Sequence, residues 1–114
     1  MVERGDVLAL KARLGFLPKG ETGRAVVVQA TRLNSILPSV LVVPLDSATA
    51  IYGQQPVVVP VSAVEAGTST SQVAVVPQVR PLRMEHFSPG VVGRLSPATL
   101  HRIDQVLRLV LDLP

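Results

Sequence analysis

A carboxylate and a guanidinium stand close together in the segment 19–24, which has the sequence Lys-Gly-Glu-Thr-Gly-Arg. Gly20 and Gly23 allow backbone conformations that other residues rarely adopt, so Glu21 and Arg24 can turn toward one concave site. A general base beside a cation is suited to attack on a phosphodiester, because the base removes a proton and the cation stabilises charge on the phosphoryl oxygens. The same two residues on a surface loop could also be an ordinary solvated pair, so the surrounding elements matter.

Composition limits the kinds of protein that this chain can be. Its 114 residues, of which 47% are hydrophobic, are expected to form a single domain spanning 1–114 with one modest core. Valine-rich runs separated by Pro and Gly favour strands. The absence of cysteine excludes disulfides and thiolate zinc sites, and the two histidines lack a ligand spacing. We therefore expect neither a metal nor another cofactor.

The charged residues are compatible with a nucleic-acid partner. Lys and Arg outnumber Asp and Glu by 11 to 8, giving a net charge of +3, and most of these cations are arginines, which bind phosphate well. The start of the chain, Met1 to Asp6, is charged and leads directly into a strand pattern, which leaves no room for a signal peptide. Pro and Gly interrupt the uncharged stretch 47–64, so we expect a cytoplasmic protein without a membrane span.

The amino-terminal third has the pattern of two paired strands. Alternating residues from Asp6 to Leu14 predict a strand with one buried and one exposed face. Pro and Gly between Phe16 and Gly23 predict a loop, and the apolar run from Ala25 to Ala30 predicts a strand buried on both faces. The loop therefore joins what should be an antiparallel pair.

Three more strands and a closing helix are predicted downstream. The strands are expected at 40–45, 56–61 and 71–79, the last broken at Pro77, and Pro60 indicates an edge or a bulge. Ser96 can cap a helix with Pro97 in its first turn, and apolar residues then recur at helical spacing to 111. Five short strands followed by one helix indicate a mainly β fold, a small antiparallel β-barrel or rolled sheet with a helix packed on it.

Four segments, taken in order, carry a resemblance to a known family. They are Arg-Gly-Asp-Val at 4–7, Gly-Glu-Thr-Gly-Arg-Ala-Val-Val-Val at 20–28, Val-Val-Pro-Leu at 42–45 and Gly-Arg-Leu-Ser-Pro at 93–97. Their order and spacing resemble the MazF/PemK family of toxin endoribonucleases over nearly the whole length. The resemblance implies an SH3-like barrel with a carboxyl-terminal helix. It also implies a homodimer that cleaves single-stranded RNA at short sequences and is silenced by a cognate antitoxin protein.

The resemblance also assigns catalytic residues, with two departures from the family pattern. The family's catalytic arginine falls on Arg24 and its loop carboxylate on Glu21, if the loop between them is shortened. Ala25 stands where the family usually has proline, and Asp46 stands where it has a catalytic Thr or Ser. Ser47 lies one residue later and could supply the hydroxyl if the strand end bulges, so Asp46 and Ser47 both remain candidates.

The implied chemistry needs no metal, because the ribose 2′-hydroxyl of RNA is itself the nucleophile. Glu21 would act as general base, Arg24 would stabilise charge on the phosphoryl oxygens, and Ser47 would add a hydrogen bond. The products would be a 2′,3′-cyclic phosphate and a 5′-hydroxyl. Further RNA contacts are expected from Lys19 and Thr22 in the loop and from Arg80 and Arg83, although two arginines near a turn are ordinarily surface charge.

Two other functions remain open on sequence grounds. One is a non-catalytic toxin of the same fold that binds DNA gyrase, as CcdB does, which would not need Glu21 and Arg24 together. The other is an RNA-binding barrel without catalysis. The low aromatic content, 3%, weakens that second alternative, because single-strand binders stack bases on aromatic rings.

Overall fold

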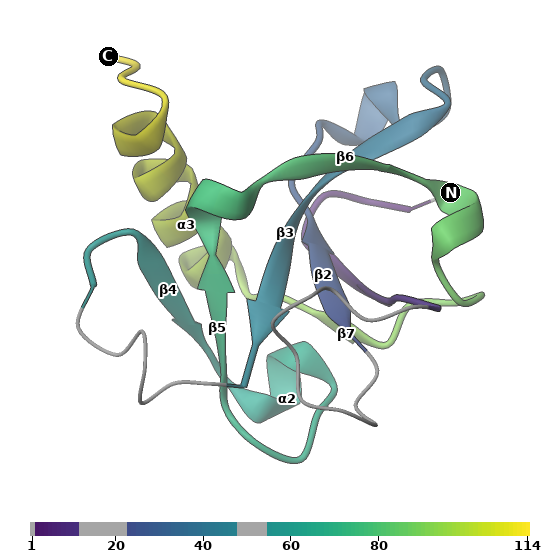
Figure 1. Cartoon of the computed structure of the whole chain (residues 1–114), viewed down its shortest axis with the longest axis horizontal. Helices are drawn as coiled ribbons and strands as arrows, with labels where there is room; N and C mark the ends of the chain where they lie inside the picture. Colours follow the sequence, from purple (N-terminus) through teal and green to yellow (C-terminus); the bar gives the residue numbers. More distant parts are fainter. Residues whose placement is uncertain (1, 12–22, 48–54) are drawn as a thin grey trace.

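The structure is a computed structural model that describes residues 2–11, 23–47 and 55–114. These residues form a twisted antiparallel sheet with one long helix packed against it (Figure 1). In this part the sheet has seven strands. They are β1 (Asp6–Ala9), β2 (Arg24–Val27), β3 (Ser39–Asp46), β4 (Val58–Val61), β5 (Gln72–Val75), β6 (Arg80–Arg83) and β7 (Gly93–Arg94). The α-helices are α2 (Ala63–Ala66) and α3 (Pro97–Val110), and short 3-10 turns are η1 (Thr31–Leu33), η2 (Val76–Gln78) and η3 (Met84–His86).

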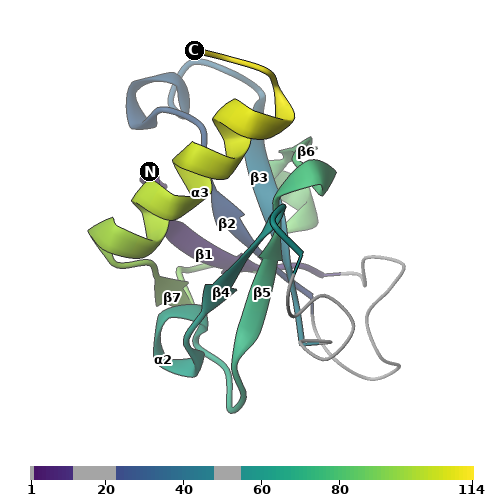
Figure 2. The same ribbon diagram turned by 90° about the vertical axis from the view of Figure 1, so that its left-hand side faces the viewer.

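The long strand β3 is the centre of the sheet. The strands follow the order β4-β5-β3-β2-β1-β7, and β6 pairs with β3 outside this path. On one side, residues 42–45 of β3 pair with β2. On the other side, residues 39–42 pair with β6, and Leu45 and Asp46 pair with β5. Because β3 changes partner halfway along, β5 and β6 diverge from it, and the sheet curls into the half-barrel visible in Figures 1 and 2.

Both faces of the central strands are buried. Alternate residues, including Val7, Val26 and Val43, pack with Ile103 of α3. The residues between them, including Leu8, Val27 and Val42, pack with Phe87 on the other face. Figure 2 shows α3 lying across the first of these faces. Such a sheet favours β-branched residues on both sides, which explains the valine-rich composition.

The predicted architecture is confirmed, with changes in the extent of its elements. The expected antiparallel pair is present as β1 and β2, and β2 is buried as predicted. The expectation that the strand starting at Asp6 has an exposed face is wrong, because all four residues of β1 are buried. A segment that is distant in the sequence covers the second face of β1. Phe87 packs there and forms an antiparallel β-bridge with Leu10. Residues 12–14 of the predicted strand lie outside the described part.

Other differences concern short elements. The strand predicted at 71–79 ends at Val75, because η2 begins at Val76 and contains Pro77. Strands β6 and β7 and helix α2 are not among the predicted elements, because β6 has the sequence Arg-Pro-Leu-Arg with a proline inside it and β7 has only two residues. Pro60 lies on β4, the outermost strand of its end of the sheet, as predicted. The helix cap is also confirmed: the Ser96 hydroxyl accepts a hydrogen bond from the Thr99 backbone N–H at 3.2 Å.

The Glu65 carboxylate joins α2 to the start of α3. Its Oε1 accepts hydrogen bonds from the Ser62 backbone N–H at 3.2 Å and from the Ser62 hydroxyl at 2.9 Å, forming a capping box. Its Oε2 accepts the backbone N–H of Ser96, the residue that caps α3, at 2.8 Å. Partial burial opposes ionisation of this carboxyl, but hydrogen bonds from Ser96, Thr99 and Ser62 together outweigh it and lower its pKa from 4.5 to about 2.

The Glu65→Gln variant is therefore expected to lose stability at neutral pH. A folded-state pKa below the unfolded value stabilises the protein above about pH 4.5, and this contribution is lost as pH falls toward 2. After allowance for the solvent that reaches the group, we expect a loss of about 1–2 kcal/mol in the free energy of unfolding at pH 7. Denaturant unfolding at pH 7 and at pH 3 measures this difference, which should shrink at the lower pH.

Glu85→Gln is a matched control, because Glu85 is exposed and forms an ion pair with the exposed Arg83. It should leave stability almost unchanged at both pH values. An equal loss for Glu65→Gln at pH 7 and pH 3 would contradict the role given to the ionised carboxylate.

Candidate functional site

Arg24 lies where the start of β2, the end of β3 and the end of α2 meet. It is the first residue of β2 and stands opposite Leu45 of β3. Its guanidinium Nη2 donates a hydrogen bond to the carbonyl oxygen of Gly67 at 3.2 Å. Gly67 caps the carboxyl end of α2 with φ +69°, and α2 lies at the same end of the sheet in Figure 1. The half-buried Arg24 side chain is therefore directed toward the end of α2.

Asp46 and Ser47 lie at the same end of the sheet as Arg24. Asp46 is the last residue of β3, is 1% exposed and stands opposite Val73 of β5. Directly opposed residues of an antiparallel pair share a face, so Arg24 is on the face of Leu45, and Asp46, the next residue, belongs to the other face. Ser47 follows directly and is half-buried. The fold thus brings the predicted arginine and both candidates for the hydroxyl position to one end of the sheet.

Three predicted site residues, Lys19, Glu21 and Thr22, lie outside the described residues. The chain on either side of their segment is fixed, because the Leu10 backbone N–H donates to the Gly23 carbonyl at 2.7 Å. Gly23, the described residue directly before Arg24, is therefore joined to the residue that follows β1.

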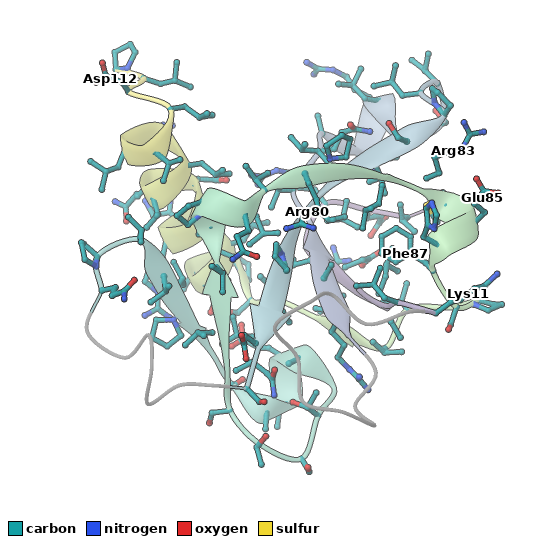
Figure 3. All side chains as sticks on the ribbon, viewed as in Figure 1. Lys11, Arg80, Arg83, Glu85, Phe87 and Asp112 are labelled. Atoms are coloured by element: carbon teal, nitrogen blue, oxygen red, sulfur yellow. The ribbon has the colours of Figure 1, made fainter. Side chains whose placement is uncertain are left out.

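Arg80 and Arg83 lie at opposite ends of β6 (Figure 3), so the structure does not place them in one cluster. Arg80 is half-buried, and its guanidinium donates to the Gln78 backbone carbonyl at 3.2 Å and to the Gln78 side-chain oxygen at 3.4 Å. Arg83 is exposed and pairs with Glu85 at 3.0 Å. Arg80 stands opposite Val42, three residues along β3 from Leu45, so it is about 10 Å along the strand from the level of Arg24.

Gly67 is a contact of Arg24 that the sequence interpretation missed. The signal for it was present: Ser62 and Glu65 have the spacing of a capping box, and Gly67 follows at the position where a helix commonly ends in a left-handed residue. In the described ranges, no group of three or more His, Cys, Asp or Glu side chains could hold a metal ion. None of the helices described is long and apolar enough to cross a membrane.

Comparison with known families identifies the chain. A family model described as "PemK-like, MazF-like toxin of type II toxin-antitoxin system" matches residues 3–111. The chain belongs to this family. The match extends from β1 to the end of α3, so the whole described fold is that of a MazF-like toxin.

Solved structures of MazF proteins have the same fold. An endoribonuclease in complex with its cognate antitoxin, from a Mycobacterial species, is 21% identical with a TM-score of 0.73, and the match covers 99% of this chain and 95% of that one. The Mycobacterium tuberculosis toxin MazF-mt6 is 14% identical with a TM-score of 0.77, and the match covers 96% of this chain and 98% of that one. A MazE-MazF structure from Deinococcus radiodurans is 17% identical with a TM-score of 0.76, and the match covers 99% of this chain and 97% of that one. A comparison with curated protein sequences gave no match.

Proposed function

We propose that this MazF-like toxin is an endoribonuclease that cleaves single-stranded RNA at short sequences without a metal ion. The family match and the endoribonuclease names of similar structures support this activity. The observation that carries it is the position of Arg24, which begins β2 beside the end of β3 and is held by Gly67. The toxin would act in the cytoplasm, where RNA and the antitoxin are available.

The proposed reaction uses the RNA's own 2′-hydroxyl as nucleophile. Glu21 takes the proton from this hydroxyl, which attacks the adjacent phosphorus and displaces the 5′-oxygen of the next nucleotide. The bond from phosphorus to that oxygen breaks, and the leaving oxygen takes a proton from water. Arg24 stabilises the charge that builds on the phosphoryl oxygens, because its guanidinium stays protonated and presents two N–H groups in one plane. The products are a 2′,3′-cyclic phosphate and a 5′-hydroxyl.

Ser47 is the better candidate for the additional hydrogen bond to the phosphate. The register of β2 and β3 assigns Asp46 to the face opposite Arg24, whereas Ser47 lies in a bend directly after β3 and is not bound by that alternation. A carboxylate is also a poor neighbour for a phosphate, because like charges repel and an ionised carboxylate has no proton to donate. If Ser47 supplies the hydroxyl, the almost completely buried Asp46 has a structural role at the end of β3.

Arg80 stands opposite Val42 and therefore on the other face of the sheet from Arg24, so RNA bound at Arg24 would have to pass around the end of the sheet to reach it. Arg80 is the stronger phosphate contact of the two arginines on β6, since Glu85 partly neutralises Arg83. Gln78 holds the Arg80 guanidinium in one orientation, which lowers the entropy lost when it binds phosphate. Lys19 and Thr22, in the segment before Arg24, are the remaining proposed contacts.

The proposed protein partners are a cognate antitoxin and a second copy of this chain. The antitoxin complexes among the similar structures support the first. For the homodimer, the support is the apolar carboxyl end of α3, where Leu109, Leu111 and Leu113 are each more than half exposed. Exposed leucines grouped on one segment mark an interaction surface more often than isolated ones do.

The first test is cleavage of a mixed-sequence single-stranded RNA by the purified protein in excess chelator. We expect cuts at a short sequence, with cyclic phosphate ends, and a loss of roughly a hundredfold to a thousandfold in rate for both Arg24→Ala and Arg24→Lys. Lysine keeps the charge but loses the planar fork. Mapping the cut sites and end groups checks the reaction.

Two outcomes would point to the alternatives. Intact RNA with a folded protein that inhibits DNA gyrase would indicate the CcdB-like binding toxin. Intact RNA that is nevertheless bound would indicate the non-catalytic RNA-binding barrel. Wild-type cleavage by Arg24→Lys would show that the bidentate role is wrong even if the chain is a ribonuclease.

Comparison of Ser47→Ala with Asp46→Asn tests which residue occupies the hydroxyl position. We expect Ser47→Ala to lower kcat roughly tenfold to a hundredfold, because a donor to the developing charge is lost. Asp46→Asn preserves the shape of the buried side chain and should change kcat less than about threefold. Single-turnover cleavage of one RNA oligonucleotide measures both, and the reverse ranking would assign the position to Asp46.

Charge placed on the end of α3 should separate the dimer. Leu109→Glu and Leu113→Glu are expected to shift the molecular mass in solution from dimer to monomer, because a carboxylate buried in an apolar contact is costly. Light scattering after size-exclusion chromatography measures this mass. Val64→Glu is the control, since Val64 is 90% exposed on α2 and should leave the dimer intact. A wild-type protein that is already monomeric would contradict the proposal.

A further inference from the structure

We propose that the segment Ala63–Gly67, here called the α2 platform, positions the Arg24 guanidinium, and that Gly93 of β7 is the positioning residue that fixes the platform. The inference rests on the proposed catalytic role of Arg24. It extends that role to residues that are not expected to touch RNA, on β7 and at the start of α3.

The α2 platform and β7 are in direct backbone contact. A Cβ atom added to Gly67 would lie 2.0 Å from the carbonyl oxygen of Val92. A Cβ atom added to Gly93 would lie 2.2 Å from the carbonyl oxygen of Glu65 and 3.0 Å from the backbone nitrogen of Gly67. Two glycines thus face each other across a contact too close for any side chain, and the close approach depends on both.

The α2 platform is also attached to the start of α3. The Glu65 carboxylate accepts the Ser96 backbone N–H at 2.8 Å while it also caps α2 through Ser62. The segment from Val92 to Ser96 is itself tied to the sheet, since the Val92 N–H donates to Val7 and the Leu95 N–H donates to Gly5. One continuous stretch of chain, from Val92 to Ser96, therefore contacts the platform both at its carboxyl end, Gly67, and through the backbone and side chain of Glu65.

Arg24 is sensitive to any movement of this platform. Its Nη2 lies 3.2 Å from the Gly67 carbonyl, near the upper limit for a hydrogen bond. An alanine at position 93 would have to move Glu65 from 2.2 Å to the 3.4 Å of ordinary contact, a displacement of about 1.2 Å. A displacement of about 1 Å in a catalytic group can lower the rate about a hundredfold. The Gly67 carbonyl carries no proton to donate, so its role is to orient the guanidinium.

The first experiment is a double-mutant cycle of Gly93→Ala and Arg24→Ala in single-turnover RNA cleavage. We expect Gly93→Ala alone to lower kcat about tenfold to a hundredfold with KM changed less than about threefold. In the Arg24→Ala background the same change should cost less than about threefold, because the guanidinium that it displaces is already gone. Equal costs in both backgrounds would overturn the proposal and leave a merely structural role.

Gly90→Ala is the matched control for backbone effects. Gly90 has a left-handed conformation, with φ +90°, which Gly93 does not share, and a Cβ atom at Gly90 would meet nothing within 4 Å. This variant introduces backbone strain in the same part of the chain without touching the α2 platform. It should lower the melting temperature and leave kcat unchanged.

A second measurement does not require catalysis or the survival of the Gly93 variant. In the free wild-type protein, the Arg24 side-chain signals in nitrogen-15 NMR should show slowed rotation about the guanidinium bonds, which an unrestrained arginine does not show. In Glu65→Gln, which loosens the other attachment of the platform, this rotation should become faster. Fast rotation in the wild type would overturn the proposal.

The cleavage and NMR measurements distinguish failure of the proposed ribonuclease activity from failure of the role given to the α2 platform. If the wild type does not cleave RNA, the proposed function fails, and the NMR measurement still decides whether the platform orients the side chain. If Arg24→Ala cleaves RNA like the wild type, the catalytic role of Arg24 fails, and with it the importance of the platform for the rate. If Arg24→Ala is inactive but folded Gly93→Ala cleaves normally, the role of the platform fails while the ribonuclease remains.

Discussion

The fold depends on the way that β3 shares its backbone hydrogen bonds among three strands. Along one edge it pairs with β2, and along the other it pairs first with β6 and then with β5. A strand that changes partner along one edge cannot remain in a flat sheet, because the two partners must diverge where they separate. The curl that results lets α3 cover one face, and chain around Phe87 covers the other.

The same arrangement determines where a site can form. The middle of β3 is covered on both faces by apolar side chains, so polar groups have room only where the strands end. Arg24, Asp46 and Ser47 all lie at one such end, together with the carbonyl of Gly67. Strand ends supply both a fixed backbone and access to solvent, which is why the candidate residues gather there.

The charged side chains of the fold have different roles. Glu65 is fully used within the protein, since it caps one helix and holds the start of another. Asp6 is similarly engaged: it is buried, accepts the Glu3 backbone N–H at 2.8 Å and pairs with Arg94. These carboxylates stabilise the frame. Arg24 and Arg80 each donate to a backbone carbonyl oxygen, that of Gly67 and that of Gln78 respectively.

The sequence by itself determined the class of fold, most of the strands, the capped carboxyl-terminal helix and the identity of Arg24 as a residue of interest. These features are local, because alternation, capping residues and proline positions act over a few neighbours. Tertiary structure alone decided that β1 is buried on both faces, that β6 pairs with β3 and that Arg80 and Arg83 lie apart. It also decided that Gly67 meets both Arg24 and the chain before β7, a contact between residues far apart in the sequence. Such pairings depend on which segments cover one another after the chain closes, and no local pattern encodes that.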